Sequence, residues 1–418
     1  MFGLAIAPVG DVDQDGFDDV LIGAPQYGDK GRGRSGKIYL YRGTPAGLAS
    51  EAAWTAIGPD EAAELGWSIA SFTQLAFDGF ADLVVGAPGA AEAPATTGKV
   101  LVYLGSKNGP SSAPSQILEA EFPGTLFGTA VATGDVNHDG ADDLLIGEPF
   151  FPSSEVASGR AHLYLASGNS FPLRPTSILS GPPGSSFGIN VSLGGDVNSD
   201  GYADAVVGAA SASFEPGLAE CGAAYVYLGS ATGLDSIPTI LPGRQAGAKF
   251  GRDVIFAGDL DADGFSDLLV GAEDGSNGER SEGVAEIYFG SRKGVSPLGS
   301  LLLESNVMGA NFGGHAGTLG DLDGDRCDDL FVGAVRYQRS EPREGAAFVF
   351  RGSRRRELVE SWFRVGGKAG SWYGSSGGTA GDVNADGFPD FIVSSCAWDT
   401  ETGVNLGRVE LYLNTRKR

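Results

Sequence analysis

Six short segments of this sequence place aspartate or asparagine at every second position, followed by a further aspartate four residues later. The first reads Asp11-Val-Asp13-Gln-Asp15-Gly-Phe-Asp-Asp19, so acids stand at positions 1, 3, 5 and 9 of a nine-residue loop. Oxygen donors at alternate positions around a tight turn suit a hard divalent cation, and Ca2+ fits them best. The segments therefore predict about six Ca2+ sites, in which position 7 adds a backbone carbonyl oxygen.

We number the loops by their order in the chain: loop 1 (11–19), loop 3 (135–143), loop 4 (196–204), loop 5 (259–267), loop 6 (321–329) and loop 7 (382–390). Position 3 is aspartate in three of them and asparagine in the other three. The predicted ligands at positions 1, 3, 5, 7 and 9 are Asp11, Asp13, Asp15, Phe17 and Asp19; Asp135, Asn137, Asp139, Ala141 and Asp143; Asp196, Asn198, Asp200, Tyr202 and Asp204; Asp259, Asp261, Asp263, Phe265 and Asp267; Asp321, Asp323, Asp325, Cys327 and Asp329; and Asp382, Asn384, Asp386, Phe388 and Asp390. We expect the carboxylate at position 9 to be able to bind the ion through both oxygens.

Two of the loops depart from this pattern. Loop 2 (74–82) stands in register with the others but carries Gln74 and Ala76 where acids are needed, so we expect it to be free of metal. Loop 6 has Arg326 at position 6, where the other five hold the glycine that a sharp turn favours. We expect the loop 6 site to be strained or weaker.

Other interpretations of the acidic loops are an EF-hand and a turn without metal. An EF-hand needs an acidic ligand at position 12, on a helix that leaves the loop. Position 12 is instead β-branched and lies in an apolar run typical of a strand: Ile22, Ile146, Val207, Val270, Val332 and Val393. The EF-hand is therefore excluded. Turns without metal are disfavoured because three or four carboxylates in one loop repel each other.

The composition fits metal-binding loops and limits the classes of partner. The 418 residues carry a net charge of −24, which argues against nucleic acid and anionic membrane surfaces. Three scattered cysteines, Cys221, Cys327 and Cys396, show no zinc-binding spacing and are expected to be buried small residues. No apolar stretch is long enough to span a membrane. Because the chain opens inside the first repeat without a signal peptide, we expect the N-terminus to be truncated and further domains to lie upstream.

The acidic loops recur about every 62 residues, which indicates a repeat architecture. Each unit has an aromatic-glycine pair, an alternating segment, the loop, an apolar run ending in Gly-Ala-Pro or a relative, a variable loop and a segment of alternating aromatics. Period-two patterns bounded by glycine predict strands, and a weaker fourth strand closes the first six units. The units start near Phe2, Leu65, Phe127, Phe187, Phe250, Phe312 and Tyr373.

Four antiparallel strands per unit and seven units predict an all-β fold, a seven-bladed β-propeller that forms one domain over residues 1–418. The strand that would complete the seventh blade is missing after residue 413. We expect it to be supplied from the N-terminal side of the chain, upstream of Phe2.

The recurrence of Phe-Gly, acidic loop and Gly-Ala-Pro resembles the FG-GAP repeats of the integrin α-subunit head, over essentially the whole chain. The resemblance implies that each Ca2+ loop joins the first and second strands of a blade, on the face opposite the ligand-binding face. It also implies an extracellular or cell-surface location. Six complete loops and the lack of an inserted domain suggest a secreted, bacterial relative.

Catalytic motifs find little support in this sequence. The histidines, His138, His162 and His315, have no neighbouring serine or cysteine nucleophile in a known motif, so we expect surface or core roles and no enzyme activity. The alternatives are the propeller part of a secreted enzyme (a lyase, hydrolase or phospholipase) and a purely structural surface module.

Recognition is then expected from the variable loops between the second and third strands. The candidate contact residues there are aromatic: Tyr27, Phe151, Phe214, Tyr337 and Trp398. The main hypothesis is a calcium-stabilised adhesion module that binds a protein or glycan through this face, with no nucleic acid as partner and no direct membrane insertion.

Overall fold

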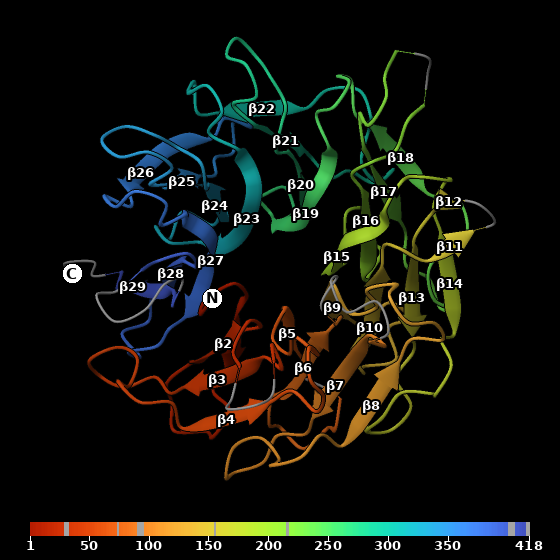
Figure 1. The fold of residues 1–418 in the computed structure, drawn as a ribbon, viewed down its shortest axis with the longest axis vertical. Helices are drawn as coiled ribbons and strands as arrows, with labels where there is room; N and C mark the ends of the chain where they lie inside the picture. The colour runs from red at the N-terminus through yellow and green to blue at the C-terminus, as the bar shows by residue number, and fades with distance from the viewer. Residues whose placement is uncertain are drawn as a thin grey trace.

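The computed structural model describes residues 1–28, 33–72, 75–89, 96–153, 156–214, 217–399 and 406–414. Seven antiparallel sheets follow one another around a central axis, as Figure 1 shows looking down that axis. Six sheets have four strands, paired in chain order from the inside to the outside, and the seventh has three. The predicted all-β, seven-bladed propeller is therefore confirmed.

The blades contain the following strands. Blade 1 has β1 (Ile6–Gly10), β2 (Asp19–Ala24), β3 (Lys37–Tyr41) and β4 (Trp54–Ile57); blade 2 has β5 (Ser68–Phe72), β6 (Asp82–Ala87), β7 (Lys99–Tyr103) and β8 (Gln116–Glu119); blade 3 has β9 (Val131–Gly134), β10 (Asp143–Glu148), β13 (Arg160–Tyr164) and β14 (Ser177–Ser180). Blade 4 has β15 (Phe187–Gly195), β16 (Asp204–Ala209), β17 (Ala223–Tyr227) and β18 (Thr239–Pro242); blade 5 has β19 (Phe250–Gly258), β20 (Asp267–Ala272), β21 (Val284–Tyr288) and β22 (Leu301–Glu304). Blade 6 has β23 (Phe312–Gly320), β24 (Asp329–Ala334), β25 (Ala346–Arg351) and β26 (Val359–Val365); blade 7 has β27 (Tyr373–Gly381), β28 (Asp390–Ser395) and β29 (Arg408–Tyr412). A small hairpin, β11 (Pro152–Ser153) and β12 (Val156–Ala157), extends from blade 3.

The second strands form the most deeply buried layer. In blades 1 to 6 every residue of the second strand is buried, because both faces of the sheet are covered by neighbouring blades. This explains why these strands are apolar without alternation. The outer strands show alternating burial instead, as in β14 and β18.

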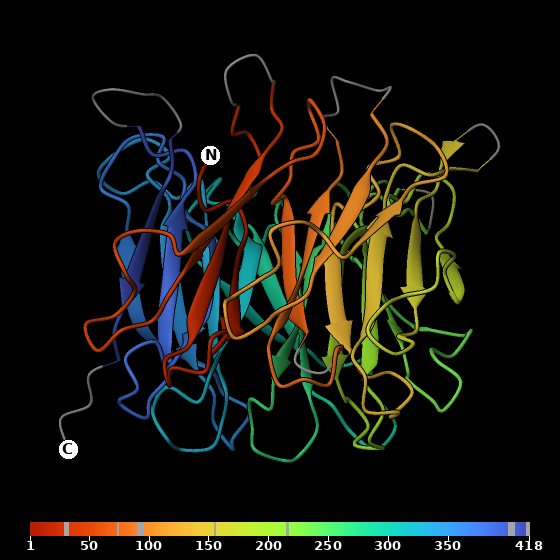
Figure 2. The ribbon, with the colours of Figure 1, turned by 90° about the horizontal axis from the view of Figure 1, so that it is seen from below.

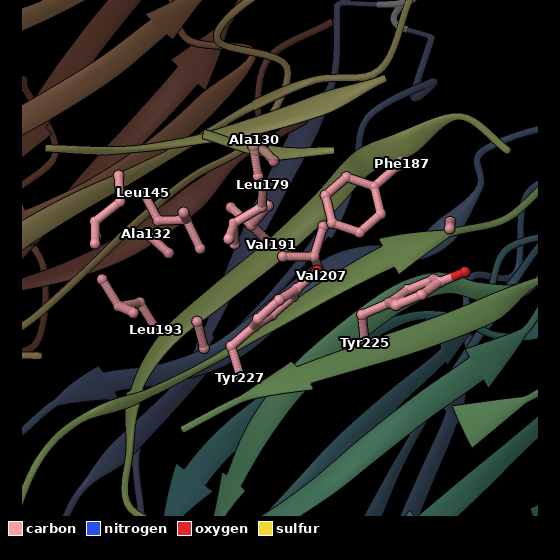
Figure 3. Packing of buried hydrophobic residues seen from close by; sticks show 14 of the residues in the cluster. Ala130, Ala132, Leu145, Leu179, Phe187, Val191, Leu193, Val207, Tyr225 and Tyr227 are labelled. Carbon is pink, nitrogen blue, oxygen red and sulfur yellow. The ribbon is translucent and has the colours of Figure 1, made fainter. Parts of the chain in front are cut away.

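The hydrophobic core lies between blades. Figure 3 shows one such interface, in which Ala132 and Leu145 of blade 3 face Val191, Val207 and Tyr227 of blade 4. Phe187, from the aromatic-glycine pair of blade 4, packs edge-on against Tyr225 at a centroid distance of 5.2 Å. Each blade thus completes its core only by contact with its neighbours.

The two glycine motifs of each repeat meet across the blade interface. A Cβ added to Gly147, in the second strand of blade 3, would lie 2.1 Å from the carbonyl oxygen of Gly188 in blade 4. Gly23 and Gly66, Gly86 and Gly128, Gly208 and Gly251, Gly271 and Gly313, and Gly333 and Gly374 meet in the same way. Only glycine permits this backbone approach. The Phe-Gly motif of one blade and the Gly-Ala-Pro motif of the preceding blade therefore form one packing contact.

The ring closes where the first residues meet blade 7. The Phe2 N–H donates to the carbonyl of Leu406 at 3.0 Å, and β1 packs beside β27. In Figure 2, seen from the side, blades 1 and 7 stand next to each other like the other neighbours. Within the described residues blade 7 has three strands, and an upstream closing strand stays a prediction.

Three smaller sequence predictions can be compared with the structure. The three cysteines are free and buried, as expected. The described part of the chain contains no helix that could span a membrane. The aromatic-glycine pair begins the first strand only in blades 4 to 7; in blades 1 to 3 the strand starts later in the sequence.

Candidate metal sites

The acidic loops join the first and second strands of their blades, all at the same end of the propeller. In loop 1, β1 ends at Gly10, positions 1 to 8 form the connection, and Asp19 at position 9 is the first residue of β2. The same placement recurs in the other loops. Because the strands are antiparallel, the variable loops between second and third strands lie at the opposite end.

Positions 1 and 5 shape the loop through main-chain hydrogen bonds. Asp11 accepts the N–H groups of Asp15 at 3.0 Å and Gly16 at 2.8 Å, and Asp15 in turn accepts the N–H of Phe17 at 3.1 Å. The corresponding bonds are present in loops 3 to 7. These bonds curl the chain around the point where the carboxylates converge.

Carboxylates at positions 1, 3 and 5 come together in the three loops that have aspartate at position 3. In loops 1, 5 and 6 one oxygen from each of these residues lies within 4.8 Å of the others. Oδ1 of Asp13 and Oδ1 of Asp261 are buried and have no hydrogen-bond partner. Unpartnered buried oxygens among converging carboxylates fit a divalent cation, which would satisfy them.

The position-9 aspartate has a second role that the sequence analysis did not identify. Asp19 is buried; its Oδ2 accepts the N–H of Val12 at 3.1 Å and its Oδ1 accepts the N–H of Gly43 at 2.9 Å. Equivalent bonds exist in loop 2, where Asp82 accepts from Ala76 and Gly105 although positions 1 and 3 hold no acid. This carboxylate therefore ties the loop to the end of the third strand independently of any metal.

Burial also changes the acidity of these carboxyl groups. It raises the pKa of Asp19, Asp143, Asp204 and Asp267 to about 7, against the lowering effect of the two N–H donors. The pKa of Asp329 and Asp390 rises to about 6 for the same reason. A cation would compete with a proton at these positions.

Loop 6 achieves its turn with a different residue order. The other six loops, loop 2 included, place a non-glycine residue in the left-handed region at position 4 and glycine at position 6, as with Gln14 and Gly16 in loop 1. Loop 6 has Gly324 at position 4, and Arg326 at position 6 adopts a φ of +77°. The expected strain at Arg326 is therefore present in the backbone. In loop 2, Gln74 lies outside the described residues.

Adjacent loops are linked to each other by their first and eighth positions. The N–H of Asp18 donates to the Asp382 carbonyl at 3.2 Å, and the N–H of Asp328 donates to the Asp259 carbonyl at 2.9 Å. The side chains reinforce both links, because Oδ2 of Asp18 accepts the Asp382 N–H and Oδ2 of Asp328 accepts the Asp259 N–H, each at 2.8 Å. These acidic loops are thus in direct contact across the junctions of blades 7 and 1 and of blades 5 and 6.

Arginines lie against three of the loops, and sequence reasoning missed them. Arg42 reaches Oδ2 of Asp13 at 2.8 Å, Arg351 reaches Oδ2 of Asp323 at 2.9 Å, and Arg356 reaches Oδ2 of Asp261 at 2.5 Å. The signal was present in the repeats, since Arg42 and Arg351 both directly follow the alternating aromatics of a third strand.

The five predicted contact aromatics lie on five different blades and differ in exposure. Phe151 is buried beneath the guanidinium of Arg160, 3.2 Å from its ring centroid. Tyr337 packs edge-on against Phe348 and Phe363. These two rings support their own loops.

The other three aromatics are more accessible. Trp398 is half-buried between Lys368 and Arg408, and Tyr27 is half-buried with Lys37 near its ring. Phe214 is 41% exposed. Among the described residues no ring contact joins any two of the five, so they do not form one cluster.

The histidines show one pairing that the sequence did not reveal. His162 Nε2 and Glu148 Oε2 lie 2.7 Å apart, both buried, at a cleft of about 450 Å3 at the outer side of blades 2 and 3. His315 lies at the central channel, where burial lowers its pKa to about 4. No serine or cysteine hydroxyl or thiol bonds to either imidazole in the described residues.

Comparison with protein families matches residues 2–41, 127–164 and 187–228 to the FG-GAP repeat. Integrin alpha-3 from Cricetulus griseus is 38% identical over 176 residues, which are 40% of this chain and 16% of that protein. Phosphatidylinositol-glycan-specific phospholipase D from Bos taurus is 35% identical over 158 residues, 36% of this chain and 19% of that protein. The matches thus span about a sixth to a fifth of these relatives. These repeats and the seven-bladed fold together support an integrin-like FG-GAP propeller.

Among solved structures, the β-propeller domain of the Trilobed protease from Pyrococcus furiosus, which has an open velcro topology, is similar over 95% of this chain and 92% of that chain. Its identity to this chain is 12% and the TM-score is 0.41. A likeness of this size adds nothing to the fold assignment, which rests on the seven sheets themselves.

Proposed function

We propose that this chain is a calcium-stabilised extracellular binding module that recognises a protein or glycan partner through the loops opposite its calcium loops. The integrin-like FG-GAP propeller supports a binding or adhesion module in general. The observation that carries the calcium part is the convergence of three carboxylates in loops 1, 5 and 6, with the buried oxygens of Asp13 and Asp261 unpartnered.

The ions have a structural role in this proposal. Each loop takes its ligands from a single strand connection, so a bound cation ties the first strand of a blade to the second. A cation that binds only the folded state stabilises it, by about 2.7 kcal/mol for one site at a free concentration of 100 Kd. Several such sites would raise the melting temperature by several degrees.

Thermal melts with Ca2+ and with excess EGTA test this part of the proposal. We expect Ca2+ to raise the melting temperature, and Asp200→Asn, at position 5 of loop 4, to reduce that rise. Asp78→Asn is the matched control, because Asp78 holds position 5 of loop 2 and bonds to the Phe80 N–H in the same way at 3.0 Å. Identical melts with Ca2+ and EGTA would refute the calcium proposal.

The partner is proposed to bind at the face of the second-to-third-strand loops. Phe214 and Trp398 are its accessible aromatic candidates, and Trp398 is flanked by two cationic side chains. Exposed aromatic rings with neighbouring cations are enriched in recognition surfaces. Tyr337 and Phe151 are less suitable for testing because they hold their own loops together.

Glycan and protein arrays probed with the wild type, Phe214→Ala and Trp398→Ala test the binding face. Leu298→Ala is the control, since Leu298 is 83% exposed in the connection of β21 to β22, at the opposite end of the propeller. We expect a hit that weakens in the first two variants and not in the control. A hit that weakens only in the control would place binding on the calcium-loop face.

The second candidate is the propeller part of a secreted enzyme. It is favoured by the similarity to the phospholipase D named above, which covers only part of either protein. The test is hydrolysis of glycosylphosphatidylinositol by the purified chain. Turnover abolished by His162→Ala, in a variant that still melts cooperatively, would overturn the proposal that this chain is not an enzyme.

A further inference from the structure

We infer that Arg42, Arg351 and Arg356 are built-in counter-ions of the three all-aspartate loops, which hold loops 1, 6 and 5 in shape when no cation is bound. The inference rests on the proposed calcium binding for its ion-loaded state. The stability of the protein without a bound cation can be measured separately.

The first observation is the pairing itself. In each all-aspartate loop an arginine contacts Oδ2 of the position-3 aspartate, and in loop 5 Arg356 also reaches Oδ2 of Asp263 at 2.8 Å. The aspartate is the buried partner: the Asp13 side chain is 9% exposed and the Asp261 side chain 3%. Removing the cationic partner of a buried carboxylate costs more than breaking a pair in which both groups are exposed.

The second observation is the absence of such arginines where position 3 is asparagine. In loops 3, 4 and 7 no ion pair to a ligand position is present among the described residues. Asn137 and Asn198 instead donate their side-chain N–H to the position-5 aspartate at 2.9 and 2.8 Å. The amide therefore replaces both the extra carboxylate and its arginine.

The third observation is that the residue type at one place in the repeat, at or just after the end of the third strand, varies together with the residue at position 3 of the loop. The residue just after the third strand is Arg42 in blade 1 and Arg351 ends that strand in blade 6, whereas the equivalent residues beside the asparagine loops are Leu165, Leu228 and Leu413. Loop 2, with Ala76 at position 3, has Leu104 there. At this position, arginine accompanies the aspartate loops of blades 1 and 6, and leucine accompanies the asparagine and alanine loops.

Blade 5 supplies its arginine from the next blade. Its residue after the third strand is Phe289, and Arg356 of blade 6 lies over that ring at 4.9 Å on its way to Asp261. Arg356 adopts a φ of +58° in a turn where blades 1, 2, 4 and 5 have Gly47, Gly109, Gly233 and Gly294. A left-handed arginine is less favourable than glycine. The contact of Arg356 with Asp261 offsets this cost.

Charge explains why the pairing follows this rule. An all-aspartate loop has four carboxylates at its ligand positions, and one guanidinium leaves three net negative charges. An asparagine loop reaches the same value with three carboxylates. Without the arginine, an ion-free all-aspartate loop would have one more unbalanced carboxylate than its counterparts. The arginine also reduces the attraction of the loop for Ca2+. It therefore lowers the affinity for the ion and raises the stability of the ion-free protein.

The test compares four proteins in a double-mutant cycle, by thermal melts after removal of divalent ions on a chelating resin and again with Ca2+. Arg356→Gly removes the guanidinium and relieves the backbone, and Asp261→Asn/Arg356→Gly copies the arrangement of loop 4. We expect Arg356→Gly to lower the ion-free melting temperature by about 1–3 °C and the double variant to restore it. The rise caused by Ca2+ should be larger in Arg356→Gly than in the wild type.

Controls separate this inference from the others. Arg355→Gly makes the same charge change at the neighbouring residue, for which the structure gives no ion pair, and should leave the ion-free melt unchanged. Arg42→Leu with Asp13→Asn repeats the cycle in blade 1, copying Leu165 and Asn137. An ion-free melt that Arg356→Gly raises, or that Asp261→Asn fails to restore, overturns the counter-ion role. A wild type that does not respond to Ca2+ refutes the proposed calcium binding instead.

Discussion

At the scale of single residues, the position-9 aspartate is both a candidate metal ligand and an acceptor of main-chain hydrogen bonds. The sequence motif does not separate these two roles. Asp82 is buried and accepts two main-chain N–H groups in a loop without acids at positions 1 and 3. The nine-residue pattern allowed prediction of where oxygen donors lie, because spacing fixes which side chains point into the turn. It could not reveal bonds to Gly43 or contacts with Arg356, because these depend on which strands and blades are neighbours.

The raised pKa of the position-9 carboxyls predicts a pH dependence of the ion-free protein. A pKa raised to about 7 from the ordinary value of 3.8 means that the folded state holds more protons than the unfolded state between these values. This contribution to stability is full below pH 3.8 and is lost as the pH rises through 7. We therefore expect this effect to make the melting temperature of the ion-free protein higher at pH 5 than at pH 7.5.

The measurement is a series of melts from pH 5 to pH 7.5 on resin-treated protein, with and without added Ca2+. Ca2+ should raise the melting temperature more at pH 7.5 than at pH 5, since it competes with protons for the same carboxyls. An ion-free protein that becomes steadily more stable toward pH 7.5 would contradict the raised pKa values.

At the scale of elements, the blades are positioned by glycine contacts between neighbouring strands. The strands themselves were predictable, because alternation and buried apolar runs reflect which sheet faces are covered. The starts of β1, β5 and β9 were not, since the aromatic-glycine segment meets the preceding blade in every repeat but is part of its own first strand only in blades 4 to 7. The sequence pattern does not show whether such a segment, besides meeting the preceding blade, also belongs to the first strand of its own blade.

Gly147→Ala should destabilise the propeller by more than about 2 kcal/mol, because the new methyl would overlap the Gly188 carbonyl and the blades cannot move apart independently. Denaturant melts would measure it. Gly33→Ala is the control, since a methyl there meets only the flexible Glu61 side chain, at 3.2 Å. Equal stability of the two variants would show that the interface between blades 3 and 4 tolerates expansion.

At the scale of the whole molecule, the chain runs through six of the junctions between blades, and in the described residues the junction of blade 7 with blade 1 is held by non-covalent contacts. Asp18 bridges that seam through its bond to the Asp382 N–H. The seven repeats made the ring predictable from the sequence, because a repeat with exposed flanks needs neighbours on both sides. The residues that close it could not be assigned before the first and last blades were placed together.

Asp18→Ala should weaken the seam by about 1.5–3 kcal/mol, the usual cost of losing a hydrogen bond to a charged group. Hydrogen exchange should then increase in β1 and β29 before the other strands. Asp328→Ala is the matched control, because Asp328 makes the same 2.8 Å bond between blades 5 and 6, whose strands stay connected by the chain. Uniform exchange in both variants would show that the seam is no weaker than the other junctions.

The closing contacts of the ring also have a mechanical consequence. Phe2 lies at the end of the propeller with the variable loops, whereas Asn414 lies at the end with the acidic loops, where its N–H bonds to Asp390 at 2.7 Å. A tension applied between these two points would load the seam of blades 1 and 7 before any other junction. Under force the ring would therefore open at one fixed place, and the bond of Asp18 with Asp382 would be among the first to bear the load.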